Sequence, residues 1–122
     1  MKSLVAGQWI DSSDGNVIQV LNPATNELVD TVPSLTKEDT ERAIEAAYVA
    51  QKAWAEKSVV ERCAIMTKFA ELVLRDKDSL ARLLSDETGK PIKEAIAEIG
   101  NIQVGVPAYV EKVKHDYGNV IY

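Results

Sequence analysis

The chain has 122 residues, with 14 basic and 19 acidic side chains that give a net charge of −5. Its hydrophobic fraction of 46% and charged fraction of 27% indicate a soluble globular protein rather than a disordered one. The acidic excess, without basic clusters, predicts that it binds neither nucleic acid nor an anionic membrane. We expect a cytoplasmic protein, because no apolar run is long enough for a membrane span, the first residues do not resemble a signal peptide and the single cysteine cannot form an internal disulfide.

The first 34 residues predict a β-hairpin and turns. Residues 4–11 and 17–21 are rich in Val, Ile and Trp and are expected as its two strands, joined by a loop over residues 12–16. Two strands alone are marginal in water, so Trp9 is expected to cover a neighbouring element. A short third strand is expected over residues 27–32.

The first helix is expected to begin near Thr36. This threonine supplies a capping hydroxyl, and acidic residues follow it in the first turn. Ala43, Ala47, Ala50 and Trp54 then recur at helical spacing and form one face. Such small side chains predict close packing of this helix, with the tryptophan as an anchor at its end.

A second helix is expected to follow a capping box, in which Ser58 and Glu61 have the required spacing. Its apolar pattern is interrupted at residues 76–78, which leaves two alternatives: one helix with an irregular middle, or two helices with a tight join. The pattern ends at Gly89, which suits the left-handed position after a helix C-terminus.

A third helix is expected to open at Pro91, where a missing N–H costs nothing. Pro107 is expected to kink or break it, and Gly118 to end it. Residues 120–122 have strand-like composition, so the sequence predicts a segment of a longer protein. The predicted fold is α/β and α-rich, an N-terminal hairpin followed by three to four helices. It forms one incomplete domain over residues 1–122, with hairpin and turns at 1–34, helices at 35–117 and the start of a strand at 118–122.

Few side chains could carry chemistry. Cys63 lies in an apolar helical stripe, which favours a buried structural thiol over a nucleophile. His115 lies among lysines at a helix end and is expected to be a capping charge. Arg62 is equally consistent with a solvated charge and with an anchor. Glu94 and Glu98 are four residues apart; a solvated helix face is expected, although paired carboxylates can also bind a cation or transfer protons.

The glycines form no G-x-G-x-x-G motif or phosphate loop, and no Cys, His or carboxylate cluster has metal-ligand spacing. The sequence therefore predicts no catalytic, cofactor-binding or metal-binding residue. Read alone, these residues indicate an α-rich domain with an N-terminal hairpin, and no reaction.

Several short motifs together resemble the amino-terminal portion of aldehyde dehydrogenases. In order, they are VAGQW at 5–9, NPAT at 22–25, ED at 38–39, the alanine-rich helix at 43–54, ER at 61–62, ETGKP at 87–91, and Glu98. The resemblance spans nearly the whole chain and looks nearest to bacterial enzymes of the succinate-semialdehyde or lactaldehyde dehydrogenase type.

The resemblance implies an enzyme that oxidises an aldehyde to a carboxylic acid with NAD or NADP, as a homo-oligomer. In the family a cysteine thiolate attacks the aldehyde, hydride passes to nicotinamide, and a glutamate-activated water hydrolyses the thioester. The corresponding family residues lie beyond residue 122, and Cys63 is not in the family's cysteine motif. This segment alone is therefore expected to bind no cofactor and to be inert.

In some family members the NPAT turn and a carboxylate of the third helix help bind a monovalent cation, which makes Thr25 and Glu98 the possible equivalents here. Lys90 is expected to be a corner residue rather than a catalytic lysine. Ala6 stands where the family usually has glycine or asparagine, and Asn26 stands where it usually has glycine. Residues 105–107 fall where the family has an unbroken helix.

A second hypothesis is that the chain is a self-sufficient small helical module that has kept this scaffold. Its apolar helix faces would then bind a partner or mediate self-association.

Overall fold

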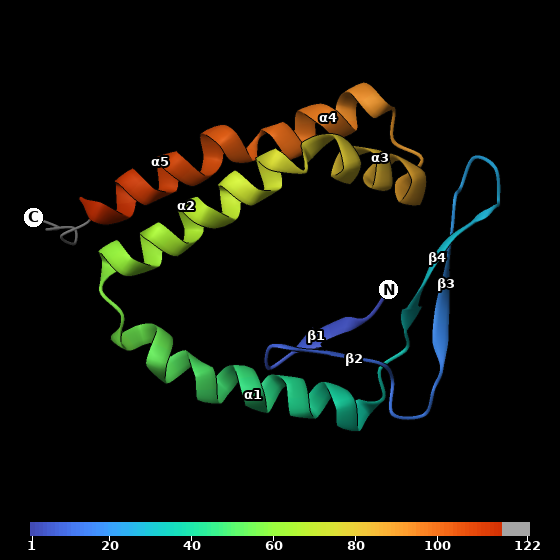
Figure 1. Cartoon of the computed structure of the whole chain (residues 1–122), viewed down its shortest axis with the longest axis horizontal. Coiled ribbons are helices and arrows are strands. Elements are labelled where there is room, and N and C mark those ends of the chain that lie inside the picture. The colour runs from blue at the N-terminus through green and yellow to red at the C-terminus, as the bar shows by residue number, and fades with distance from the viewer. Residues whose placement is uncertain (116–122) are drawn as a thin grey trace, which may run out of the picture. The chain divides into compact units, whose positions relative to one another are not determined.

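The structure, a computed structural model, describes residues 1–115 of the chain. Its contacts group the described residues into two compact units, one of Met1–Glu56 with Asp86–Gly89, the other of Lys57–Ser85 with residues 90–115. The predicted helix stop at Gly118 and the predicted strand start at 118–122 lie outside the described residues. The elements in chain order (Figure 1) are β1 (Ser3–Val5), β2 (Gln8–Ile10), β3 (Val17–Leu21), β4 (Leu28–Pro33), α1 (Lys37–Glu56), α2 (Val59–Arg75), α3 (Lys77–Thr88), α4 (Ile92–Gly100) and α5 (Ile102–Lys114).

The strands form two separate hairpins instead of the single pairing that the sequence predicted (Figure 1). β1 pairs antiparallel with β2, and β3 pairs antiparallel with β4. The run 4–11 folds back on itself because Ala6 and Gly7, with φ of 50° and 78°, form a two-residue turn of the kind that suits hairpins. The predicted pairing of residues 4–11 with 17–21 is therefore wrong. The third strand predicted over residues 27–32 is confirmed as β4.

The loop between β3 and β4 is held by its own hydrogen bonds. The side-chain oxygen of Asn22 accepts from the backbone N–H groups of Ala24 and Thr25, at 2.9 and 3.3 Å. Asn26 adopts a left-handed φ of 60°, and its N–H donates to the carbonyl of Asn22 at 2.7 Å. Asparagine tolerates this conformation well, so Asn26 can form the same turn as the glycine that the family usually has here.

The helix ends agree with their local signals. Ser58 and Glu61 form the predicted capping box, each accepting from the other's backbone N–H. Gly89 follows α3 with a φ of 73°, and Pro91 immediately precedes the first residue of α4. The interrupted pattern of the second predicted helix proves to be two helices, α2 and α3, joined at Asp76.

The third predicted helix is interrupted at Asn101, between α4 and α5. The sequence predicted that Pro107 would kink or break the helix, and the break is wrong, because α5 continues through it. A proline in a helix removes one backbone hydrogen bond. The helix α5 also packs along α2, a tertiary contact that the local proline rule does not include.

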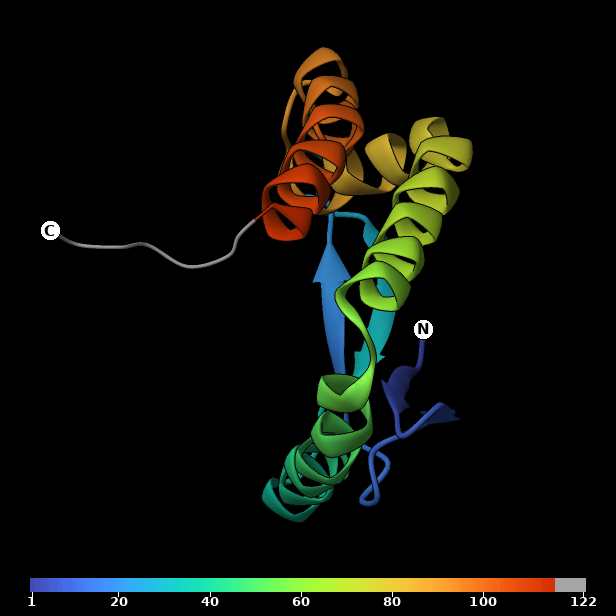
Figure 2. The ribbon, with the colours of Figure 1, turned by 90° about the vertical axis from the view of Figure 1, so that its left-hand side faces the viewer.

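In the second unit, α2 and α5 lie side by side and antiparallel (Figures 1 and 2). The buried apolar residues of this unit are all small, namely Cys63, Ala70, Ala81 and Ala95. Small side chains let helix backbones approach closely, so this unit packs by proximity of its helices rather than around large side chains.

Several large apolar side chains remain exposed among residues 1–115. Trp9 is 65% exposed, so the expectation that it covers a neighbouring element is wrong within the described residues. Val104 and Tyr109 of α5 are 74% and 71% exposed. No described helix is both long and apolar enough to cross a lipid bilayer.

Candidate functional site

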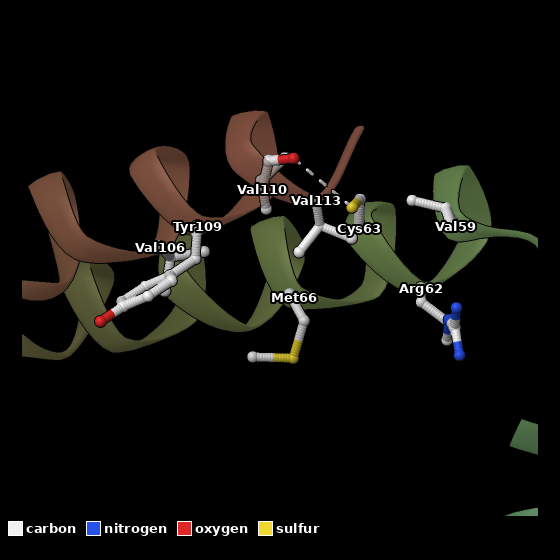
Figure 3. Close-up of a pocket in the computed structure, with 8 residues that line it drawn as sticks. All are labelled: Val59, Arg62, Cys63, Met66, Val106, Tyr109, Val110 and Val113. Carbon is white, nitrogen blue, oxygen red and sulfur yellow. Dashed lines mark hydrogen bonds between the residues drawn. The ribbon is translucent and has the colours of Figure 1, made fainter. Parts of the chain in front are cut away.

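A groove of about 360 Å³ lies between α2 and α5 (Figure 3). Arg62 is at one end of it and the tyrosine ring of Tyr109 is toward the other. Its wall is otherwise made of apolar side chains and one thiol, from Val59, Cys63, Met66, Val106, Val110 and Val113. Such a wall suits apolar side chains of a protein segment better than a charged small molecule, which would lack hydrogen-bond partners along it.

Cys63 lies in the wall of this groove, and His115 follows the last residue of α5. Cys63 is 7% exposed, and its Sγ lies 4.0 Å from the carbonyl oxygen of Val110, as Figure 3 shows. The predicted burial of this thiol is confirmed. His115 is the C-cap residue of α5, as expected for a capping charge, and its Nε2 lies 3.7 Å from Glu111 Oε2.

The two residues proposed for a cation lie in different units. Thr25 is in the β3–β4 loop, where its hydroxyl accepts from the N–H of Glu27 at 3.3 Å. Glu98 is in α4, and its carboxylate is paired with the ammonium of Lys90. A cation at Glu98 would therefore have to compete with that lysine. Within residues 1–115 no three Cys, His, Asp or Glu side chains are grouped as metal ligands. The cation role of Thr25 and Glu98 stays a prediction.

The most deeply buried charged side chain among the described residues is Asp39, in the first turn of α1, which is 1% exposed. Its Oδ2 accepts from the backbone N–H and the hydroxyl of Ser13, both at 3.0 Å, and from the N–H of Thr36 at 3.1 Å. Its Oδ1 pairs with Arg42. These donors, the Ser13 N–H foremost, hold the pKa of Asp39 well below its usual range. It is therefore ionised at neutral pH and acts as a lock between the β2–β3 loop and α1, not as a proton donor.

Part of this lock is encoded locally in the sequence. Thr36 and Asp39 have the i, i+3 spacing of a capping box, and the threonine hydroxyl accepts from the Asp39 N–H at 3.1 Å. That spacing predicts the carboxylate's contact with its own helix end. It carries no information on Ser13, which is 26 residues away in the chain.

Two of the motifs that carry the resemblance, NPAT at 22–25 and ETGKP at 87–91, approach each other at Pro23 and Gly89, both in the first unit. A methyl group placed on Gly89 would lie 2.9 Å from Cγ of Pro23, closer than packed carbon atoms allow. The close approach therefore requires glycine for two reasons, its left-handed φ and its missing side chain. Next to it, the Lys90 ammonium pairs with Glu98.

The sequence matches the model of the aldehyde dehydrogenase family over residues 9–122. The chain belongs to the aldehyde dehydrogenase family. It is 42% identical over 120 residues to a succinate semialdehyde dehydrogenase of Acinetobacter baylyi, and 39% identical to a glutarate-semialdehyde dehydrogenase of Pseudomonas putida. Each alignment covers 98% of this chain and 25% of the relative, so the chain spans about a quarter of the length of the curated relatives it matches.

Solved structures agree with this assignment. A crystal structure of an aldehyde dehydrogenase from Brucella melitensis biovar abortus matches with a TM-score of 0.92 and 36% identity, over 99% of this chain and 25% of that one. A betaine aldehyde dehydrogenase from Staphylococcus aureus, solved in complex with NAD+, matches with a TM-score of 0.90 and 30% identity, over 98% of this chain and 24% of that one.

Among residues 1–115 no helix begins with a glycine-rich turn of the kind that holds a dinucleotide. A diphosphate is usually held by free backbone N–H groups at a glycine-rich helix N-terminus. At the N-terminus of α1 the N–H of Asp39 bonds to the Thr36 hydroxyl, and at that of α2 the N–H of Glu61 bonds to the Ser58 hydroxyl. The α4 terminus begins with Pro91, which has no N–H.

Proposed function

We propose that this chain is the scaffold segment of an NAD(P)-dependent aldehyde dehydrogenase, an oxidoreductase that converts an aldehyde to a carboxylic acid. The observation that carries the proposal is the family match over residues 9–122. The part of the chain that the structure describes supports a scaffold role, because its most buried carboxylate is fully engaged as a helix lock and its cysteine is a buried thiol.

The substrate class that we propose is the semialdehyde of a short dicarboxylic acid. The printed names of two relatives, a succinate semialdehyde and a glutarate-semialdehyde dehydrogenase, support it. Use of NAD+ or NADP+, homo-oligomeric assembly and a cytoplasmic location belong to the same proposal. We also propose that residues 1–122 form one incomplete domain that other parts of the enzyme complete, and that alone they are catalytically inert.

Two assays test this proposal separately. The full-length natural protein should reduce NAD+ or NADP+ with succinate semialdehyde or glutarate semialdehyde, followed by absorbance of the reduced nucleotide. The 122-residue chain should give no reduction in the same assay and no heat on titration with NAD+. Failure of the full-length protein with every aldehyde tried would contradict the proposed activity, whereas nucleotide binding by the short chain would contradict only its inertness.

A second candidate is the small binding or assembly module. It is favoured by the exposed apolar side chains of α5, Val104 and Tyr109, and by the apolar groove beside them. This module would self-associate or bind an apolar dye as an isolated chain. Sedimentation of a compact monomer that binds no dye would exclude it.

A further inference from the structure

The exposed turn between β2 and β3 contains an Asp14–Gly15 pair. An aspartate followed by glycine offers its side-chain carboxyl to the least hindered of backbone amides, since glycine has no Cβ. Gly15 has a φ of 74°, and nothing lies within 4 Å of the position a Cβ would take. No neighbouring atom therefore crowds the Gly15 Cα on that side of the turn.

The reaction open to this pair needs only water. The Gly15 nitrogen attacks Cγ of protonated Asp14, a C–N bond forms, and the carboxyl OH leaves with the amide proton as water. The resulting succinimide adds water at one of its two carbonyls. Opening at Cγ restores aspartate, whereas opening at the backbone carbonyl gives isoaspartate, in which the chain runs through the side-chain carbon.

In the folded turn both reacting groups, the Gly15 N–H and the Asp14 carboxylate, are engaged in hydrogen bonds. The Gly15 N–H donates to the carbonyl of Ser12 at 3.0 Å. The Asp14 Oδ1 accepts from the Ser12 hydroxyl at 2.7 Å and from the Asn16 N–H at 2.9 Å, and its Oδ2 accepts from the Asn16 side-chain amide at 2.8 Å. These bonds, that from the Ser12 hydroxyl foremost, lower the pKa of Asp14 and so reduce the reactive protonated form.

We propose that Asp14–Gly15 is a latent isoaspartate site that its own turn keeps unreactive while the protein is folded. Ser12 and Asn16 are the residues that hold it. Conversion would insert one carbon into the backbone next to Ser13, which bonds to Asp39 and thereby links the loop to α1. Damage at this site would therefore weaken the lock at the start of α1.

The test compares the full-length natural protein with a synthetic peptide of residues 8–21, both aged at neutral pH. Peptide mapping by mass spectrometry and labelling with isoaspartyl methyltransferase measure isoaspartate at Asp14. The Asp78–Ser79 pair in α3, also an aspartate before a small residue, is the internal reference in the same samples. If reaction requires opening of the turn, each hydrogen bond of ordinary strength slows it roughly fivefold, so the native rate should be at least roughly fivefold below the peptide rate.

Two variants identify the holding residues. Ser12→Ala and Asn16→Ala should each raise the rate at Asp14 by roughly fivefold, without a rise at Asp78. The Asn16 side chain is exposed, so its variant is expected to keep the fold if Ser12→Ala does not. Equal rates in native protein and peptide would overturn the proposal, as would folded variants whose rate at Asp14 is unchanged.

Discussion

Replacement of Gly89 by alanine should destabilise the protein for two separable reasons. Alanine at the observed φ of 73° costs about 1–2 kcal/mol, of which about 0.4–1 kcal/mol is offset because alanine restricts the unfolded chain. The added methyl would also lie 2.9 Å from Pro23 Cγ, so one of the two must move. Overpacking of this kind costs about 1–3 kcal/mol, and we expect a total loss of about 2–4 kcal/mol.

Gly15 provides a matched control. Its φ of 74° is nearly the same as that of Gly89, but an added methyl meets nothing within 4 Å. Gly15→Ala should therefore carry only the conformational cost, about 1 kcal/mol. Urea unfolding of the full-length natural protein, followed by circular dichroism, measures both variants, and a change in midpoint at constant slope reports stability.

A double variant isolates the contact itself. Pro23→Ala removes the Cγ atom that the new methyl would meet, so adding it to Gly89→Ala should recover part of the loss. Equal destabilisation by Gly89→Ala and Gly15→Ala, together with no recovery in the double variant, would refute the contact between the NPAT turn and the ETGKP corner.

Three further changes test local features of the structure. Ala6→Gly relieves an alanine at φ 50° and should stabilise the protein by about 0.5–1 kcal/mol in the same urea titration; an unchanged midpoint would contradict a left-handed residue 6. Asp39 has a pKa that folding depresses, so its stabilisation is present above its unfolded-state pKa near pH 4 and is lost as pH falls toward the folded value. Asp39→Asn should therefore be less stable at neutral pH and lose less stability below about pH 4 than the wild type, and parallel pH profiles of the two proteins would argue against this. Ser58→Ala removes the cap of α2 and should cost about 1 kcal/mol, whereas Ser58→Thr, which keeps a hydroxyl that accepts from the Glu61 N–H and donates to its carboxylate, should cost little; a similar loss in both variants would exclude the capping role.

The candidate sites were predictable only in part. The burial of Cys63 followed from its place in a helical apolar stripe, and the capping position of His115 followed from its place at a helix end. The Lys90–Glu98 pair did not follow, because eight residues and a helix start separate the two side chains. The groove between α2 and α5 required the pairing of helices far apart in the chain, which no local pattern encodes.

The sequence by itself determined the features that depend on a few neighbouring residues. The capping box at Ser58, the left-handed stop at Gly89 and the helix start after Pro91 are each fixed by backbone sterics and hydrogen bonds within one turn. The ordered motifs also indicated the aldehyde dehydrogenase family, which the family match over residues 9–122 confirms.

Only the tertiary structure decided which strands pair and which distant groups meet. The turn at Ala6 and Gly7 could not be predicted because Ala6 adopts a conformation that glycine usually adopts. Because this turn pairs β1 with β2, β3 pairs with β4 instead. The bonds from Ser13 to Asp39 and the approach of Gly89 to Pro23 join residues far apart in sequence. Such contacts arise from the packing of whole elements, because their partners are chosen by position in space and not by spacing along the chain.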